Sequence, residues 1–215
     1  VTAASAVIEL PEGMGAREAA LTEPAATALH ALNLASRALV RPVPECAVLV
    51  IGGGAIGLLA ALLLRTWGAR RIHLAETNAL RRDAARRAAA VEAFDPLAGG
   101  GPPEGTMDLV IDAVGAAPTR KAALAAVKPG GVVLHIGLQD WSSEIDMRKL
   151  TLAEITLVGA YTYSTADLRA AARALHEGAF GDLAWVEERP LAEGARAFDD
   201  LHHGRSAAAK ILLRP

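Results

Sequence analysis

An uninterrupted run of eighteen uncharged residues, 47–64, limits the fold of this chain more than any other feature. The run has the sequence AVLVIGGGAIGLLAALLL. Its first five residues are apolar and mostly β-branched, as in a buried parallel strand, and its second half has the leucine-rich character of a buried helix. Between these parts lie Gly52, Gly54 and Gly57, in the spacing G-x-G-x-x-G. The sequence therefore predicts a strand over 47–51, a tight turn, and a helix over about 55–67.

A transmembrane helix is the main alternative for an apolar run of this length. Four glycines interrupt it, and Glu45 and Arg65 stand on either side, which favours the strand, turn and helix. Residues 1–10 lack the basic start of a signal peptide, and Glu9 interrupts their apolar stretch. The only cysteine, Cys46, excludes an internal disulfide and suits a reducing compartment. We therefore expect a cytoplasmic protein.

The glycine spacing is typical of a βαβ unit that binds a dinucleotide. Gly52 permits the turn, Gly54 lets the backbone approach a pyrophosphate, and Gly57 lets the helix lie close on the sheet. Glu76 stands 19 positions beyond Gly57, at the end of the next apolar run. A carboxylate there accepts hydrogen bonds from both ribose hydroxyls and repels a 2′-phosphate, so NAD is favoured over NADP. The alternative is that Glu76 is only a surface carboxylate at a strand end.

Strand and helix patterns alternate along most of the chain. Strands are predicted over 91–94, 107–113, 131–137 and 154–160, and helices over 23–38, 79–89, 118–127 and 166–177. Residues 1–24 are predicted to be irregular. From Trp185 the pattern changes to a short strand, a helix over 191–201 and a strand over 208–213. The alternation predicts an α/β fold, a Rossmann doubly wound parallel sheet with helices on both faces.

Charge and the other polar residues exclude several classes of function. A net charge of −2 gives no reason to expect nucleic acid or an anionic membrane as partner. His202 and His203 are adjacent, so on a helix they point in different directions and predict a solvated helix end instead of a metal site. His30 and His135 are expected at an interface and in the core. No residue can be assigned as catalytic from these patterns.

Six segments in order resemble the zinc-type medium-chain alcohol and polyol dehydrogenases, of the sorbitol and threonine dehydrogenase kind. They are TEPAATALHA, VLVIGGGAIGLLA, MDLVIDAVG, VKPGGVVLHIGL, AEITLVGAYTYS and PLAEGARAFDDLHHGRSAAAKILLRP. The resemblance implies a discontinuous catalytic domain, of which flanking remnants occur here. Residues 1–35 would be one remnant with a linking helix, 36–184 the NAD-binding Rossmann domain, and 185–215 the return to the catalytic domain.

The resemblance also implies roles for individual residues. The three glycines would hold the pyrophosphate with Ile56 beneath it, Glu76 would bind the ribose, and Arg81 would lie beside the adenine. The nicotinamide half of the cofactor would lie along residues that follow the later strands. These are Val114, Gly115, Ile136, Gly137, Leu138, Ala160 and Tyr161.

The chain departs from the family at the zinc site. The cysteine and the Gly-His-Glu motif that hold the family's catalytic zinc do not occur in this sequence. Glu23 matches a family glutamate that can approach or ligate the zinc, but it is equally explained as a charge at a helix N-terminus. A lone carboxylate cannot hold zinc, which needs three or four ligands. The sequence therefore suggests a truncated chain that binds NAD and turns over nothing by itself, with zinc in the intact protein.

Three hypotheses remain open at this point. The first is the cofactor half of an NAD- and zinc-dependent dehydrogenase of a small alcohol or polyol. The second is a stand-alone, non-catalytic dinucleotide-binding module. The third is a zinc-free reductase of the quinone or enoyl type, against which Glu23 and Glu76 argue. The edge strand over 154–160 can pair across a two-fold axis, and the resemblance implies a homodimer or homotetramer formed through such edges.

Overall fold

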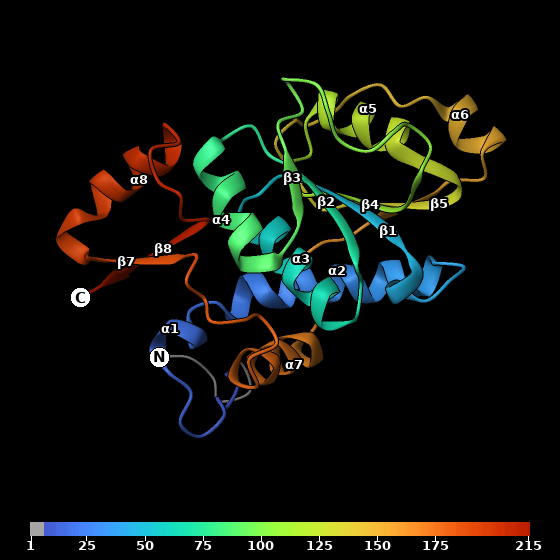
Figure 1. Ribbon diagram of the computed structural model, residues 1–215. Helices are drawn as coiled ribbons and strands as arrows, with labels where there is room; N and C mark the ends of the chain where they lie inside the picture. Colours follow the sequence, from blue (N-terminus) through green and yellow to red (C-terminus); the bar gives the residue numbers. More distant parts are fainter. Residues whose placement is uncertain (1–6) are drawn as a thin grey trace.

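A six-stranded parallel sheet forms the centre of the molecule, in the computed structural model that describes residues 7–215 (Figure 1). Its strands are β1 (Ala47–Ile51), β2 (Arg71–Ala75), β3 (Glu92–Phe94), β4 (Met107–Asp112), β5 (Val127–His135) and β6 (Thr156–Gly159). Their order is β3-β2-β1-β4-β5-β6, and the neighbouring strands run parallel throughout. The predicted doubly wound sheet is confirmed, with its switch point between β1 and β4.

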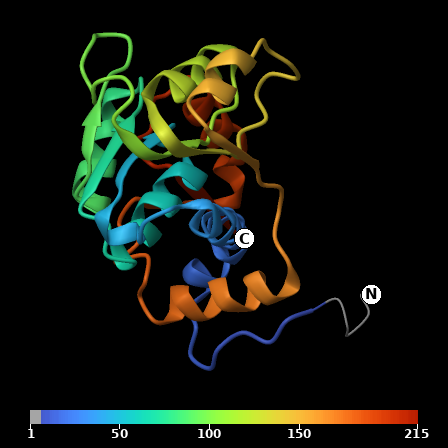
Figure 2. The same ribbon diagram turned by 90° about the vertical axis from the view of Figure 1, so that its right-hand side faces the viewer.

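Helices cover both faces of the sheet. On one face lie α2 (Thr22–Ala38), α3 (Ala55–Thr66), α4 (Ala79–Ala89) and α7 (Thr165–His176), and on the other lie α5 (Ala117–Ala126) and α6 (Met147–Leu152). Figure 2 shows α7 as an outer layer beyond α2. A short helix, α1 (Ala16–Ala19), and a 3-10 turn, η2 (Val43–Glu45), precede the first strand.

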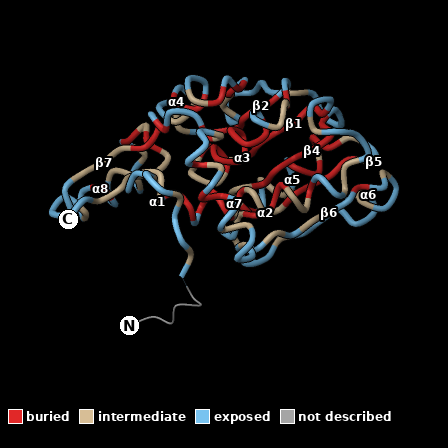
Figure 3. The backbone as a smooth tube through the Cα atoms, turned by 90° about the horizontal axis from the view of Figure 1, so that it is seen from below, coloured by how far each residue is buried: buried red, intermediate tan, exposed pale blue. Residues whose placement is uncertain are grey.

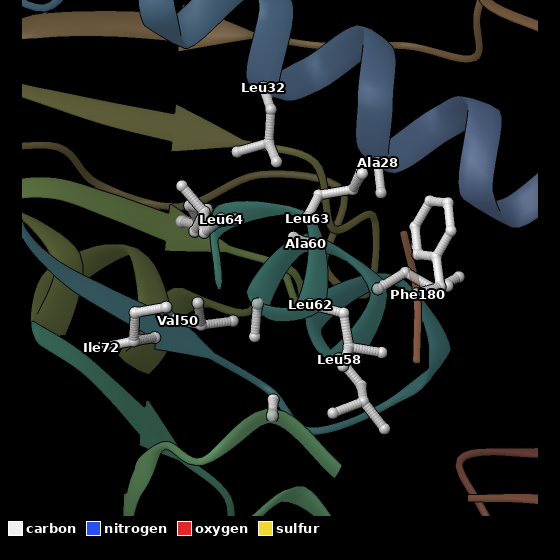
Figure 4. Close-up of a cluster of buried hydrophobic side chains, with 14 of the residues drawn as sticks. Ala28, Leu32, Val50, Leu58, Ala60, Leu62, Leu63, Leu64, Ile72 and Phe180 are labelled. Atoms are coloured by element: carbon white, nitrogen blue, oxygen red, sulfur yellow. The ribbon is translucent and has the colours of Figure 1, made fainter. Parts of the chain in front are cut away.

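Helix α3 is deeply buried in the core of the molecule (Figure 4). It is apolar all round because it lies between α2 and the sheet, where every side is covered. Its leucines are at most 5% exposed and meet side chains of α2, β1 and β2. The residues labelled in this cluster are Ala28, Leu32, Val50, Leu58, Ala60, Leu62, Leu63, Leu64, Ile72 and Phe180. This packing fixes the helix that follows the glycine loop.

Several boundaries differ from the sequence-based prediction. Strand β5 begins at Val127 instead of at 131, because Val127 already pairs with Met107 of β4 and the Gly130 N–H donates to the Ala153 carbonyl at 2.8 Å. Strand β6 begins only at Thr156, since Glu154 has φ +50°. The sequence analysis missed α1 and α6. Helix α6 begins where the Asp146 side chain accepts from the Lys149 N–H.

The C-terminal segment forms a smaller lobe beside the sheet. It consists of β7 (Val186–Pro190), the turn η3 (Leu191–Glu193), α8 (Gly194–His202) and β8 (Lys210–Arg214), with β7 and β8 paired in parallel. Figure 3 shows that this lobe is largely exposed or half-buried. Arg189 links its parts through Glu187 at 2.6 Å and Asp200 at 2.8 Å. The predicted domain limits at 35 and 184 stay predictions. In residues 7–215 no helix combines the length and the apolarity needed to cross a bilayer.

Candidate dinucleotide-binding site

The carboxyl ends of five strands meet in one row across the sheet. Ile51 pairs with Ala75 on one side and with Asp112 on the other, and the row continues from Asp112 through His135 to Gly159. Most of the predicted cofactor residues lie in the loops that leave the strands at this row. In open α/β sheets such an edge, at the switch point, is where ligands bind. The register thus brings together residues that are far apart in the sequence.

The turn from β1 into α3 contains three glycines, and the space around the backbone differs at each of them. Gly52 has φ +99°, and a Cβ on it would lie 2.7 Å from Cγ2 of Val114. A Cβ on Gly57 would lie 1.9 Å from the Gly52 carbonyl oxygen, so helix and loop touch directly. A Cβ on Gly54 would meet no protein atom within 4 Å. The fold therefore requires Gly52 and Gly57, whereas at Gly54 the backbone faces open space.

Helix α3 begins without a capping side chain. Gly54 is its N-cap, and its first turn contains no acidic residue. By contrast, α4, α6 and α7 are capped by the side chains of Asn78, Asp146 and Ser164. Uncapped N–H groups at the positive end of a helix dipole form a site for an anion. The first turn of α3 is therefore suited to hold a phosphate.

Glu76 is buried at the end of β2, with 8% of its surface exposed. Its Oε2 accepts a hydrogen bond from the Gly53 N–H at 2.8 Å, and its Oε1 accepts one from the Asn78 N–H at 2.8 Å. Oε1 also accepts a long hydrogen bond from the Thr77 hydroxyl at 3.4 Å. A carboxylate oxygen has about two lone-pair sites, so Oε2 keeps one free, and rotation of the Thr77 hydroxyl would free one on Oε1. Two adjacent hydroxyls of a ribose match these two positions. The structure thus places Glu76 against the glycine loop, and the explanation as a mere surface carboxylate is wrong.

The loops after β4 and β5 lie directly against each other. A Cβ on Gly115, which has φ +74°, would lie 2.0 Å from the Gly137 carbonyl oxygen. The loop after β4 is held by Asp112, which is fully buried and accepts from the N–H groups of Val114 at 3.0 Å and Gly115 at 2.8 Å. Asp112 was not among the site residues predicted from the sequence. Its position at the end of β4 was the signal for this loop-organising role.

The remaining predicted nicotinamide residues continue the row. Ile136 is buried, and the Ala160 N–H donates to the His135 carbonyl at 3.0 Å. Leu138 is 74% exposed and Tyr161 is 75% exposed, so both side chains stand at the open edge. Ile56, in the first turn of α3, is half-buried beside the glycine loop.

The start of α4, which follows β2 at this edge, contacts the C-terminal lobe. Arg81, one turn into α4, donates from Nη2 to the Leu201 carbonyl at 3.2 Å, and Asn78 donates from Nδ2 to the Gly204 carbonyl at 2.7 Å. Arg81 is therefore held near Glu76 by the end of α8. The sequence analysis did not foresee this contact, because it joins segments about 120 residues apart.

Glu23 lies at the start of α2, and its side chain is exposed. Tyr163, just after β6, has its hydroxyl beside this carboxylate. Burial, together with the Glu23 carboxylate, raises the pKa of the Tyr163 phenol. The sequence analysis missed Tyr163, and no spacing signal could have found it. Among residues 7–215 no group of three or more potential metal ligands comes together, so the described residues do not fit a zinc ion.

The other singled-out residues have structural partners. The Nδ1 of His30 lies 2.9 Å from Oδ2 of Asp167, which joins α2 to α7 as an interface histidine would. The Nε2 of His135 accepts from Nε of Arg120 at 3.0 Å. His202 and His203 are exposed at the end of α8, as expected. Cys46 is a buried free thiol, and burial raises its pKa.

Comparison with known proteins identifies the family. Residues 55–177, more than half of the chain, match the family model described as zinc-binding dehydrogenase. A sorbitol dehydrogenase of Bombyx mori is 29% identical over 221 residues, covering 95% of this chain and 60% of its own length. The chain belongs to the zinc-binding dehydrogenase family, and the resemblance to its polyol dehydrogenases is confirmed.

Solved structures agree with this assignment. A protein of Sinorhizobium meliloti, assigned as a zinc-binding dehydrogenase and bound to NADP, superimposes with a TM-score of 0.79 at 28% identity, over 97% of this chain and 62% of its own. Acetophenone reductase of Geotrichum candidum in complex with NAD gives a TM-score of 0.80 at 25% identity, over 97% of this chain and 58% of its own. The chain thus spans about three fifths of the length of these relatives.

Proposed function

We propose that this chain is the NAD-binding part of a dehydrogenase that moves hydride between a secondary alcohol or polyol and NAD. The observation that carries the proposal is the buried carboxylate of Glu76, hydrogen-bonded to the glycine loop through Oε2, which keeps a free acceptor site. Beside it stand the uncapped start of α3 and the open space at Gly54. The carboxylate matches a ribose, and the uncapped helix start matches a pyrophosphate. The open space at Gly54 lets the pyrophosphate approach the backbone.

In this proposal each part of the edge has one task. The N–H groups of the first turn of α3 bind the pyrophosphate, Glu76 binds the adenosine ribose, and Arg81 lies beside the adenine. The paired loops at Val114-Gly115 and at 136–138 orient the nicotinamide through main-chain groups, and Ala160 and Tyr161 close its far side. Bound NAD supplies the hydride-accepting ring. The catalytic residues are not assigned.

The polyol side of the reaction is proposed from the relatives alone. Glu23 is the one residue here that the family resemblance connects with zinc, and Tyr163 is its neighbour at the carboxyl edge. We propose that Tyr163 donates a hydrogen bond to Glu23 and so orients the carboxylate toward the substrate side. Zinc in the intact protein would need ligands from elsewhere, since the described residues do not hold it.

Calorimetric titration with NAD and with NADP tests the proposal. NAD should bind one site, and repulsion of the 2′-phosphate by Glu76 should make NADP at least about tenfold weaker, or ~1.4 kcal/mol. Absence of NAD binding would refute the proposal.

The alternative of a non-catalytic module is separated by a second measurement. The natural polypeptide is isolated from its source, its mass is compared with 22.2 kDa, and NAD reduction is followed with a panel of polyols. Turnover by a longer polypeptide supports the dehydrogenase. A natural polypeptide of 22.2 kDa that binds NAD without turnover favours the module.

A homodimer through β6 is a further part of the proposal. Strand β6 pairs only with β5 in the described sheet, so one edge is open. Leu157 of this strand is 41% exposed and lines a pocket of about 340 Å³ together with Gly159. We propose that two copies pair their β6 strands across a two-fold axis. Light scattering should show a dimer that Leu157→Lys dissociates; a monomeric wild type would contradict this.

A reducing compartment such as the cytoplasm fits the free thiol of Cys46.

A further inference from the structure

Gly53 occupies the first x of the G-x-G-x-x-G motif. It lies where the Glu76 side chain enters the glycine loop. A Cβ on Gly53 would lie 3.0 Å from Oε2, 3.1 Å from Cγ and 3.3 Å from Cβ of Glu76. These are its three nearest atoms, and all belong to the one side chain. Such distances are tighter than ordinary van der Waals contacts, so a methyl group at 53 would require the Glu76 side chain to shift by a few tenths of an ångström.

The reason for glycine at 53 differs from the reasons at its neighbours. Gly52 needs its positive φ, and Gly57 lies against a carbonyl oxygen. Gly53 has no positive φ, so its backbone would accept other residues. At this position it is the Glu76 side chain that leaves little room for a Cβ.

Both partners of this contact are fixed in place. The loop is tied to β2 by the Gly52 N–H, which donates to the Ala75 carbonyl at 2.8 Å. Glu76 is tied to β3 by its own N–H, which donates to the Phe94 carbonyl at 3.1 Å, and its Oε1 is held by the Asn78 N–H. A side chain at 53 would therefore push on the carboxylate, since hydrogen bonds hold both backbones in place.

We infer that Gly53 is a positioning residue for cofactor specificity. Because it lacks a side chain, the long glutamate can extend into the loop, accept the Gly53 N–H through Oε2, and keep its remaining acceptor sites toward a ribose. Aspartate at 76 keeps a Cβ and a Cγ, but it is one methylene shorter and would not reach the Gly53 N–H, so it would lose the hydrogen bond that glycine at 53 permits. Residues 53 and 76 thus form one matched pair. This inference rests on the proposed function, namely that NAD binds at this edge.

A double-mutant cycle tests the pairing. The variants are Gly53→Ala, Glu76→Asp and the double variant, made in the full natural polypeptide and titrated with NAD and NADP. Gly53→Ala should weaken NAD about tenfold and NADP much less, so the preference for NAD falls. Glu76→Asp should weaken NAD in the wild-type background, and Gly53→Ala should cost less affinity in the Glu76→Asp background than in the wild type, because the hydrogen bond to the Gly53 N–H is already lost there. Gly15→Ala is the matched control, since a Cβ there meets nothing and the site is remote; its NAD affinity should equal that of the wild type.

The outcomes separate this inference from the proposed function. If the wild type binds NAD and the two substitutions act additively, the pairing is refuted while the NAD site stands. If the wild type binds neither dinucleotide, both fall. If Gly53→Ala does not fold, the double variant decides: folding and binding of NAD by the double variant support the pairing, and its failure to bind NAD while Glu76→Asp alone binds overturns it.

Discussion

Gly54 offers a test in which NAD binding should change strongly while stability stays nearly constant. Its backbone has φ −73° and ψ −173°, an extended conformation that alanine adopts without strain. A Cβ there meets no protein atom within 4 Å. Alanine is a weaker N-cap than glycine but also restricts the unfolded chain, and these two effects oppose each other. The free energy of unfolding of Gly54→Ala should therefore stay within about 1 kcal/mol of the wild type.

NAD binding should nevertheless fall steeply in Gly54→Ala. The new methyl group would stand between the pyrophosphate and the first N–H groups of α3. Hydrogen bonds to a charged group contribute about 1.5–3 kcal/mol each. Loss of two therefore costs at least ~3 kcal/mol, which is roughly a hundredfold in the dissociation constant.

Gly57→Ala, in the first turn of α3, is the matched comparison. Its Cβ would lie 1.9 Å from the Gly52 carbonyl oxygen, so α3 must shift away from the loop. Such overpacking costs about 1–3 kcal/mol of stability, and binding should fall as well. Urea denaturation and calorimetry on both variants separate the two effects. Gly54→Ala with wild-type NAD affinity would refute the placement of the pyrophosphate.

Three further outcomes are expected. Glu76→Ala should weaken NAD and narrow its preference over NADP, and unchanged discrimination would refute the ribose assignment. Burial alone would raise the pKa of Asp167, but hydrogen bonds from Ser164 and His30 outweigh it and hold this pKa below its usual value. Asp167 therefore adds stability above its unfolded pKa of about 4, and this stability is lost as the pH falls through the folded pKa. Asp167→Asn should cost about 0.5–2 kcal/mol at neutral pH by weakening the start of α7, with the difference from wild type closing in acid; a constant difference in urea melts across pH would contradict the charge effect. Elemental analysis of the purified 215-residue chain should find no stoichiometric zinc, and a full equivalent would reveal ligands not recognised here.

The fold could be predicted from local patterns because each pattern had one physical meaning. Five apolar residues before Gly52 and a leucine-rich segment after it are compatible with a buried strand and a buried helix, and both occur. The ends of helices and strands were harder. Strand β5 starts four residues early because Gly130 finds a backbone partner at Ala153, a contact that no local pattern contains.

The site was predictable where each residue acts through its own backbone or charge. Gly52, Gly57 and Glu76 fall into this group, and the structure supplies the close contacts that explain each of them. The contact of Gly53 with Glu76 and that of Tyr163 with Glu23 join residues from different elements. Such contacts depend on the register of the sheet and on helix placement, so the chain must be folded before they can be recognised.

A crystal structure of the protein grown with NAD tests the central claim most directly. The account predicts the pyrophosphate at the first turn of α3, the adenosine ribose within hydrogen-bond distance of both oxygens of Glu76, and the nicotinamide against residues 136–138. NAD bound away from the carboxyl edge of the sheet, or no NAD at a saturating concentration, would contradict it.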